Sequence, residues 1–139
     1  MRHSSDKHNI LKVGLAVIHE RHLMLVRKQG TQMFILPGGR HEDGEDDKAA
    51  LQREIEEELN CKLKLESICF IGDFSDAAAN EPDSVVTIRL YLGQVDGIAT
   101  PSNEIEEIRW LCPFDAPGMK IAPSIANKIL PYLTAREYL

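Results

Sequence analysis

The sequence has little of what several common classes of protein require. Its three cysteines, Cys61, Cys69 and Cys112, include no Cys-x-x-Cys pair. This spacing predicts neither a zinc site nor a disulfide framework, and we expect reduced structural thiols. No apolar run approaches the roughly 18 residues that a membrane-spanning helix needs, and the polar first residues do not resemble a signal peptide.

Positive charge is also scarce. The chain has 16 Lys and Arg residues against 22 Asp and Glu residues, which gives a formal net charge of −6 at pH 7. Proteins that bind the nucleic-acid backbone broadly need a basic surface. We therefore expect no stable nucleic-acid partner and no membrane association, and we expect a cytoplasmic location.

The chain does have a dense group of glutamates in residues 53–59, which read Arg-Glu-Ile-Glu-Glu-Glu-Leu. On a helix, residues three and four apart share a face, so Glu54, Glu57 and Glu58 project together and Glu56 falls on a different face. Their like charges repel, and a divalent cation with oxygen ligands would offset the repulsion. An acidic helix face alone is most often a solvated surface, so the surrounding residues decide the interpretation.

Those residues supply a turn and the two ends of a helix. Pro37-Gly38-Gly39, the glycine turn, follows an apolar run, and its glycines let the backbone come close to a ligand. Asp46 suits the N-cap of a helix, and Asn60 suits the left-handed residue that ends one. The pattern predicts a helix between them, with one packed face and an adjacent acidic face.

The whole segment resembles the Nudix box of the Nudix (MutT-like) hydrolase family. The pattern is Gly39, five residues, Glu45, seven residues, Arg53-Glu54-Ile55, one residue, and Glu57-Glu58. Chance agreement at so many fixed positions is very improbable for residue types of ordinary frequency. Two positions depart from the pattern, because Asn60 and Cys61 stand where the family usually has glycine and an aliphatic residue.

The resemblance implies a hydrolase of diphosphate linkages that depends on Mg²⁺, with Mn²⁺ as a substitute. The implied metal ligands are the backbone carbonyl of Gly39 and the carboxylates of Glu54, Glu57 and Glu58, the box carboxylates. One of these carboxylates would position or deprotonate the attacking water. The resemblance does not assign this role to a particular one. Arg53 would orient a box carboxylate through a bidentate pair, with Glu45 in support.

A further carboxylate often reaches this family's metal cluster from a loop before a late strand. The glutamate-rich residues 103–110 resemble that region, with Glu104 as the first choice and Glu107 as the second. Charged residues also protect sheet edges, so a solvated strand edge is the alternative. Trp110 in the same stretch is expected in the core.

Substrate contacts are less well defined by the sequence. Arg27 or Lys28, and Arg40, are candidates for phosphate contacts. Phe34 or Phe74 could stack on a base, although an aromatic residue in a strand is more often in the core. The favoured substrate is a (deoxy)nucleoside triphosphate, including an oxidised one. ADP-ribose or another nucleotide sugar, an RNA end, and a non-catalytic nucleotide sensor are the alternatives.

The rest of the chain predicts one domain. Strands are predicted at residues 11–18, 23–27, 64–74, 85–92 and 106–112. Ser124 is expected to cap a final helix running to about Leu133, in which Pro131 favours a kink or an early end. With the resemblance, this pattern predicts an α/β fold, a Nudix-type α/β/α sandwich around a mixed sheet. We expect a flexible tail at residues 1–8 and one domain at residues 9–139, and an exposed sheet edge would suit a homodimer.

Overall fold

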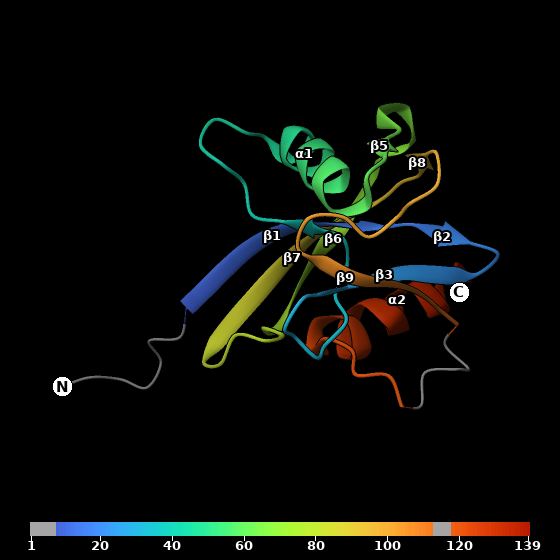
Figure 1. Ribbon diagram of the computed structural model, residues 1–139. Coiled ribbons are helices and arrows are strands. Elements are labelled where there is room, and N and C mark those ends of the chain that lie inside the picture. Colours follow the sequence, from blue (N-terminus) through green and yellow to red (C-terminus); the bar gives the residue numbers. More distant parts are fainter. Residues whose placement is uncertain (1–7, 113–117) are drawn as a thin grey trace.

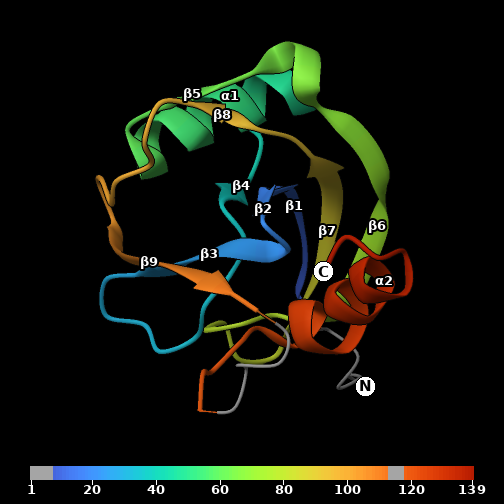
Figure 2. The ribbon, with the colours of Figure 1, turned by 90° about the vertical axis from the view of Figure 1, so that its right-hand side faces the viewer.

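The computed structural model describes residues 8–112 and 118–139 of the chain. Helix α1 (Asp47–Leu59) lies on one side of the strands and α2 (Leu130–Ala135) lies on the other (Figure 1). The view turned by 90° shows the same three layers (Figure 2). The predicted α/β/α sandwich around a mixed sheet is therefore confirmed.

The strands of the described residues form three hydrogen-bonded groups. They are β1 (His8–Ala16), β2 (Ile18–His19), β3 (His22–Lys28), β4 (Gly38–Gly39), β5 (Lys62–Leu63), β6 (Cys69–Ala77), β7 (Ser84–Leu92), β8 (Val95–Asp96) and β9 (Ile105–Leu111). The largest group has the order β4-β1-β7-β6, with β1 and β7 parallel and the other neighbours antiparallel. The other groups are β2-β3-β9 and β5-β8, both antiparallel.

Strands β1 and β3 are covered on both faces. Val13 and Leu15 of β1 pack in one hydrophobic cluster with Ile55 of α1, whereas Ala16 packs in a second cluster with Ile129 on the α2 side. Successive residues of a strand point to opposite faces, which explains why neighbouring apolar residues enter different clusters. Burial on both faces fixes the position of β1, and β1 in turn supports the glycine turn through β4.

Local sequence signals define both ends of α1 as predicted. The Asp46 side chain accepts a hydrogen bond from the Ala49 backbone N–H at 2.9 Å. Asn60 ends the helix in the left-handed conformation with φ 52° and ψ 38°, which asparagine adopts more readily than most residues. The apolar stripe of α1 consists of buried residues, namely Ala50, Leu51, Ile55 and Leu59.

Several predicted boundaries were wrong. The first strand, predicted at residues 11–18, runs from His8 to Ala16, so residue 8 of the expected tail belongs to β1. Residues 1–7 of that tail lie outside the described residues. The strand predicted at residues 64–74 begins instead with a short 3-10 helix, Leu65–Ser67, and β6 starts at Cys69.

The C-terminal helix also differs from its prediction. Ser124 makes no capping hydrogen bond because its backbone is already helical, and a π-helical segment, Ile125–Ile129, follows it. The chain stays helical through Pro131 to Ala135. Pro131 comes just after the π-helical segment, where the regular i→i−4 hydrogen-bond pattern of an α-helix is already interrupted. No helix within the two described ranges has the length and apolar character to cross a membrane.

The prediction that Trp110 is a core residue was wrong. Trp110 is 44% exposed and contacts His19 edge-on, with ring centroids 6.3 Å apart. Ile105 and Leu111 are the buried residues of β9. β9 is an edge strand of its sheet. Successive side chains of a strand point to opposite faces, so Trp110 points to the exposed face when Leu111 points to the core.

Candidate active site

The glycine turn lies directly against α1. The Gly38 backbone N–H donates to Oε1 of Glu58 at 3.0 Å. A Cβ atom on Gly39 would overlap the carboxylate of Glu54, so any side chain there would push this glutamate aside. Gly38 has φ 144°, a conformation that favours glycine. The two glycines therefore let the turn and two box carboxylates approach each other closely.

Glu58 is a carboxylate with very little exposure to water. It is 2% exposed, and its Oε2 atom has no hydrogen-bond partner among the described residues. Burial raises the pKa of Glu58 to about 8 against the opposing effect of the Gly38 hydrogen bond, and the nearby Glu54 charge raises it further. Burial also raises the pKa of Glu54, and the negative charge of Glu57 raises that pKa further.

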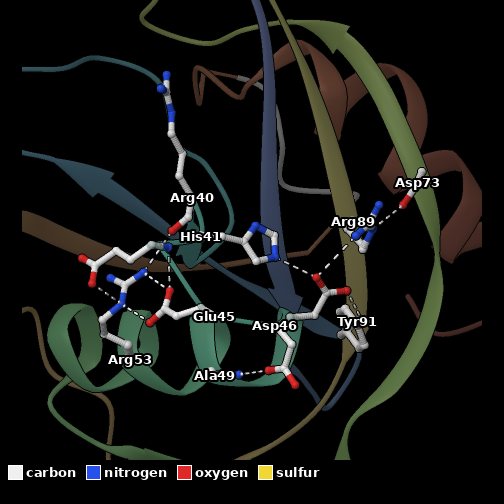
Figure 3. Close-up of polar contacts among 11 residues, drawn as sticks. Arg40, His41, Glu45, Asp46, Ala49, Arg53, Asp73, Arg89 and Tyr91 are labelled. Carbon is white, nitrogen blue, oxygen red and sulfur yellow. Dashed lines mark hydrogen bonds and ion pairs between the residues drawn. The ribbon is translucent and has the colours of Figure 1, made fainter.

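Arg53 fixes the loop between the glycine turn and α1 (Figure 3). Its Nε and Nη2 atoms donate to the two carboxylate oxygens of Glu45 at 2.7 and 2.9 Å, and Nη2 also donates to the Arg40 carbonyl at 3.0 Å. The hydrogen bonds from Arg53 lower the pKa of Glu45 to about 2. The bidentate pair of Arg53 is with Glu45 and not, as predicted, with a box carboxylate. Arg53 also lies 3.5 Å from carboxylate oxygens of Glu54 and Glu57.

A second polar network joins the same loop to the sheet. The Asp47 carboxylate pairs with His41 Nε2 at 2.7 Å and with Arg89 Nη1 at 3.4 Å, and it accepts a hydrogen bond from the Tyr91 hydroxyl. Figure 3 labels these three partners, His41, Arg89 and Tyr91. His41 belongs to the loop, Asp47 begins α1, and the other two residues lie on β7. Sequence reasoning missed this network because its members meet only through tertiary packing.

The two candidates for the additional carboxylate have different surroundings. Glu104 lies 3.1 Å from Lys28 Nζ, and its charge contributes to the raised pKa of Glu58. Glu107 instead pairs with Arg27 and Arg109, each at 3.0 Å. Of the two candidates, Glu104 is therefore the one whose charge acts on Glu58.

The predicted phosphate-binding cations are also placed differently. Arg27 is partly buried and already bound, because it pairs with Glu107 and donates to the Thr31 carbonyl at 2.9 Å. Lys28 lines a pocket beside the glycine turn. Arg40 is exposed at the edge of that region, 3.5 Å from Glu81.

Neither aromatic candidate lines the pocket beside the glycine turn. Phe34 is 6% exposed and belongs to the hydrophobic core. Phe74 packs edge-on against Tyr132 of α2, with ring centroids 5.3 Å apart. In the described structure both residues have packing roles, which was the more common expectation for an aromatic residue in a strand.

The pocket itself has a volume of about 160 Å³ and runs from the glycine turn along β1 and β7. Its polar lining residues are Lys12, Lys28, Thr31, Asn80, Glu81 and Ser124, and apolar walls come from residues such as Leu36, Val86 and Ile88. Burial is the main cause that lowers the pKa of Lys12. Sequence reasoning missed Lys12 and Glu81, because the parallel pairing of β1 with β7 cannot be read from either strand alone.

The residues present suit a hard divalent cation. The donors are carboxylate and carbonyl oxygens, which Mg²⁺ and Mn²⁺ prefer. The unpartnered, buried oxygen of Glu58 and the close fit of Glu54 against Gly39 mark where such an ion would be held. Among the described residues, no three His, Cys, Asp or Glu side chains form a ready-made metal cage.

A NUDIX domain model matches residues 8–133 of the chain. The chain therefore belongs to the Nudix family, and its predicted class, a hydrolase of pyrophosphate bonds, is confirmed. No curated protein matches the sequence.

Solved structures show the same fold. A NUDIX hydrolase from Nitrosomonas europaea has a TM-score of 0.72 at 18% identity, covering 91% of this chain and 90% of its own. The MutT protein from Methanosarcina mazei Go1 has a TM-score of 0.72 at 19% identity, with coverages of 95% and 98%. A UDP-X diphosphatase has a TM-score of 0.67 at 19% identity, with coverages of 94% and 64%.

Proposed function

We propose that the chain is an Mg²⁺-dependent pyrophosphohydrolase whose substrate is a (deoxy)nucleoside triphosphate, including an oxidised one. The observation that carries this proposal is the buried carboxylate of Glu58 beside Gly38, whose Oε2 atom has no hydrogen-bond partner among the described residues and whose pKa is raised in part by Glu54. Burying an ionised carboxylate without a counter-charge destabilises the fold by an amount on the order of several kcal/mol. A bound cation at this position would offset that cost.

Each residue near the turn has a role in this proposal. The metal would be held by the Gly39 carbonyl and by Glu54, Glu57, Glu58 and Glu104. When bound, it would neutralise the diphosphate charge and lower the pKa of a water molecule, with Mn²⁺ able to replace Mg²⁺. One box carboxylate orients or deprotonates the attacking water. Arg53 keeps the loop in place through Glu45, and Lys28 and Arg40 contact phosphate oxygens.

A nucleotide sugar such as ADP-ribose is the second candidate substrate. Hydrogen-bonding side chains, including Thr31, Asn80 and Ser124, line the pocket and would suit sugar hydroxyls. The similar fold of a UDP-X diphosphatase is compatible with this class of substrate. The proposal also includes a cytoplasmic location and no stable nucleic-acid partner, in keeping with the net charge of −6.

The proposal is tested by product release from a panel of nucleoside triphosphates and nucleotide sugars, with Mg²⁺ and with EDTA. Glu57→Gln is expected to lower kcat by about 10²-fold or more while the circular dichroism spectrum is unchanged, because a metal ligand is lost. Glu56→Gln is the matched control, since Glu56 is exposed on the same helix. It should retain the wild-type rate.

Two results would contradict the proposal. Hydrolysis that persists in EDTA would rule out the metal dependence. Nucleotide binding without turnover of any compound in the panel would instead indicate a sensor. A nucleotide sugar cleaved in preference to every triphosphate would select the second candidate.

A further inference from the structure

Lys28 lies where the metal site, the additional carboxylate and the pocket meet. It is the last residue of β3, and it alternates with Met24 and Val26, which face the α1 side of the sheet. At the end of β3 the register with β9 shifts by one residue, so that Arg27 pairs with Glu107 and Lys28 pairs with Ile105. Lys28 also lines the pocket beside the glycine turn.

Backbone and side-chain contacts hold Glu104 beside Lys28. The Gln29 backbone N–H donates to the Glu104 carbonyl at 2.8 Å. The Lys28 ammonium lies 3.1 Å from the Glu104 carboxylate, and the two side chains are 34% and 55% exposed. The loop before β9 is therefore fixed at this point by two contacts with the end of β3.

The same ammonium acts on the box carboxylates. Its positive charge lowers the pKa of Glu54 and of Glu58, against the larger effect of burial. Lys28 thus partly neutralises three of the carboxylates to which a metal-binding role is assigned. It also lines the pocket in which the substrate would lie, so it has two sets of anionic partners within reach of one side chain.

We propose that the Lys28 ammonium changes its ion-pair partner as the site is filled, from the carboxylates to the substrate phosphate. In the metal-free protein its ammonium pairs with Glu104. Were Glu104 to hold a metal ion, its carboxylate would no longer pair with Lys28, and the Lys28 ammonium would be free to contact the diphosphate oxygens. This inference rests on the proposed function, and it adds that metal binding and nucleotide binding are coupled through this residue.

The exchange has a consequence that a simple phosphate contact lacks. A cation that competes for Glu104 weakens metal binding to the free protein, so its removal should strengthen that binding. Because coupling between two ligands is reciprocal, its removal should also reduce the gain in nucleotide affinity that the metal confers. A purely structural lysine would change neither quantity in this direction.

The test is isothermal titration calorimetry of the full chain with Mg²⁺ at pH 9. Lys28→Met should bind Mg²⁺ about three- to fivefold more tightly than wild type, near the upper end of what is expected when a partly exposed ion pair is removed. Lys28→Arg, which keeps the charge, and Lys62→Met, an exposed lysine on β5, should both stay within about twofold of wild type.

The second measurement is the affinity for an α,β-methylene nucleoside triphosphate with and without Mg²⁺. The gain in affinity on adding Mg²⁺ should be smaller in Lys28→Met than in wild type by about tenfold. Mg²⁺ affinity that is unchanged or weaker in Lys28→Met would overturn this inference and leave the metal site in place. Absence of Mg²⁺ binding to wild type and to every variant would overturn the proposed function together with the inference.

Discussion

At the scale of single residues, Glu58 is a charged group at a position where an apolar residue would be expected to stabilise the fold. It lies on the packed side of α1 between Leu51, Ile55 and Leu59, which are fully buried, and the glycine turn. Charged residues are retained in such places when they bind a ligand or perform chemistry. The pKa of Glu58 is raised to about 8 because the folded protein disfavours the ionised form of this carboxyl.

We predict that Glu58→Gln makes the EDTA-treated protein more resistant to unfolding at pH 8 than wild type. The unfolded chain ionises this carboxyl near 4.5, whereas the folded chain does so near 8, so wild-type stability is lost as pH rises between these values. The cost is about 1.4 kcal/mol for each unit of pKa change. The measurement is Tm from pH 4.5 to 9 in EDTA.

The Tm difference between Glu58→Gln and wild type should grow through this pH window and become constant above it. A difference that does not change with pH would contradict the burial of an ionisable Glu58. Addition of Mg²⁺ at pH 8 should raise the wild-type Tm and leave that of the variant nearly unchanged, because ligand binding stabilises only the protein that binds.

The roles of single residues differ in how well the sequence predicts them. The relation between Glu54, Glu57 and Glu58 is set by helical geometry, and the Arg53–Glu45 pair spans one short loop. The surroundings of Arg27 and Phe74 depend on β9 and α2, which are distant in sequence. Arg27 was predicted to contact substrate as a cation at the end of a strand near the box, and Phe74 as an aromatic that could stack on a base. The structure shows Arg27 bound to Glu107 and Phe74 packed against Tyr132.

At the scale of elements, α1 is defined by its own ends. Asp46→Ala should lower stability by about 1 kcal/mol, because the N-terminal N–H of Ala49 loses its acceptor. Asn60→Gly should raise the free energy of unfolding by about 0.5 kcal/mol, since glycine adopts the left-handed conformation without strain. Urea unfolding measures both changes. Equal stability of Asn60→Ala and wild type would contradict the left-handed cap.

The loop from Arg40 to Asp46 is an element held mainly by side chains. Arg53 binds Glu45 and the Arg40 carbonyl, so its loss should free the loop that positions Gly39. We predict that Arg53→Ala and Glu45→Ala each lower kcat by about tenfold or more, and that the double variant is little worse than either single one. Steady-state kinetics of the four proteins measures this. Fully additive losses would show that the two residues act independently.

At the scale of the whole molecule, the sandwich brings residues together that no local pattern connects. Parallel pairing of β1 with β7 places Lys12 and Ile88 in one pocket, and the antiparallel pairing of β3 with β9 places Glu104 beside Lys28. The family resemblance predicted the layers, and the apolar alternation of the strands agrees with them. The pocket lining could not be predicted, because it depends on which strands become neighbours. The homodimer stays a prediction for size-exclusion chromatography.

The central claim is that α1 and the glycine turn together hold a divalent cation. The most direct test is anomalous diffraction from a crystal of the protein grown or soaked with Mn²⁺. We predict an anomalous peak within ligand distance, about 2.2 Å, of the Gly39 carbonyl oxygen and of at least one carboxylate oxygen of Glu54, Glu57 or Glu58. Ordered box residues with no Mn²⁺ peak among them would contradict the claim.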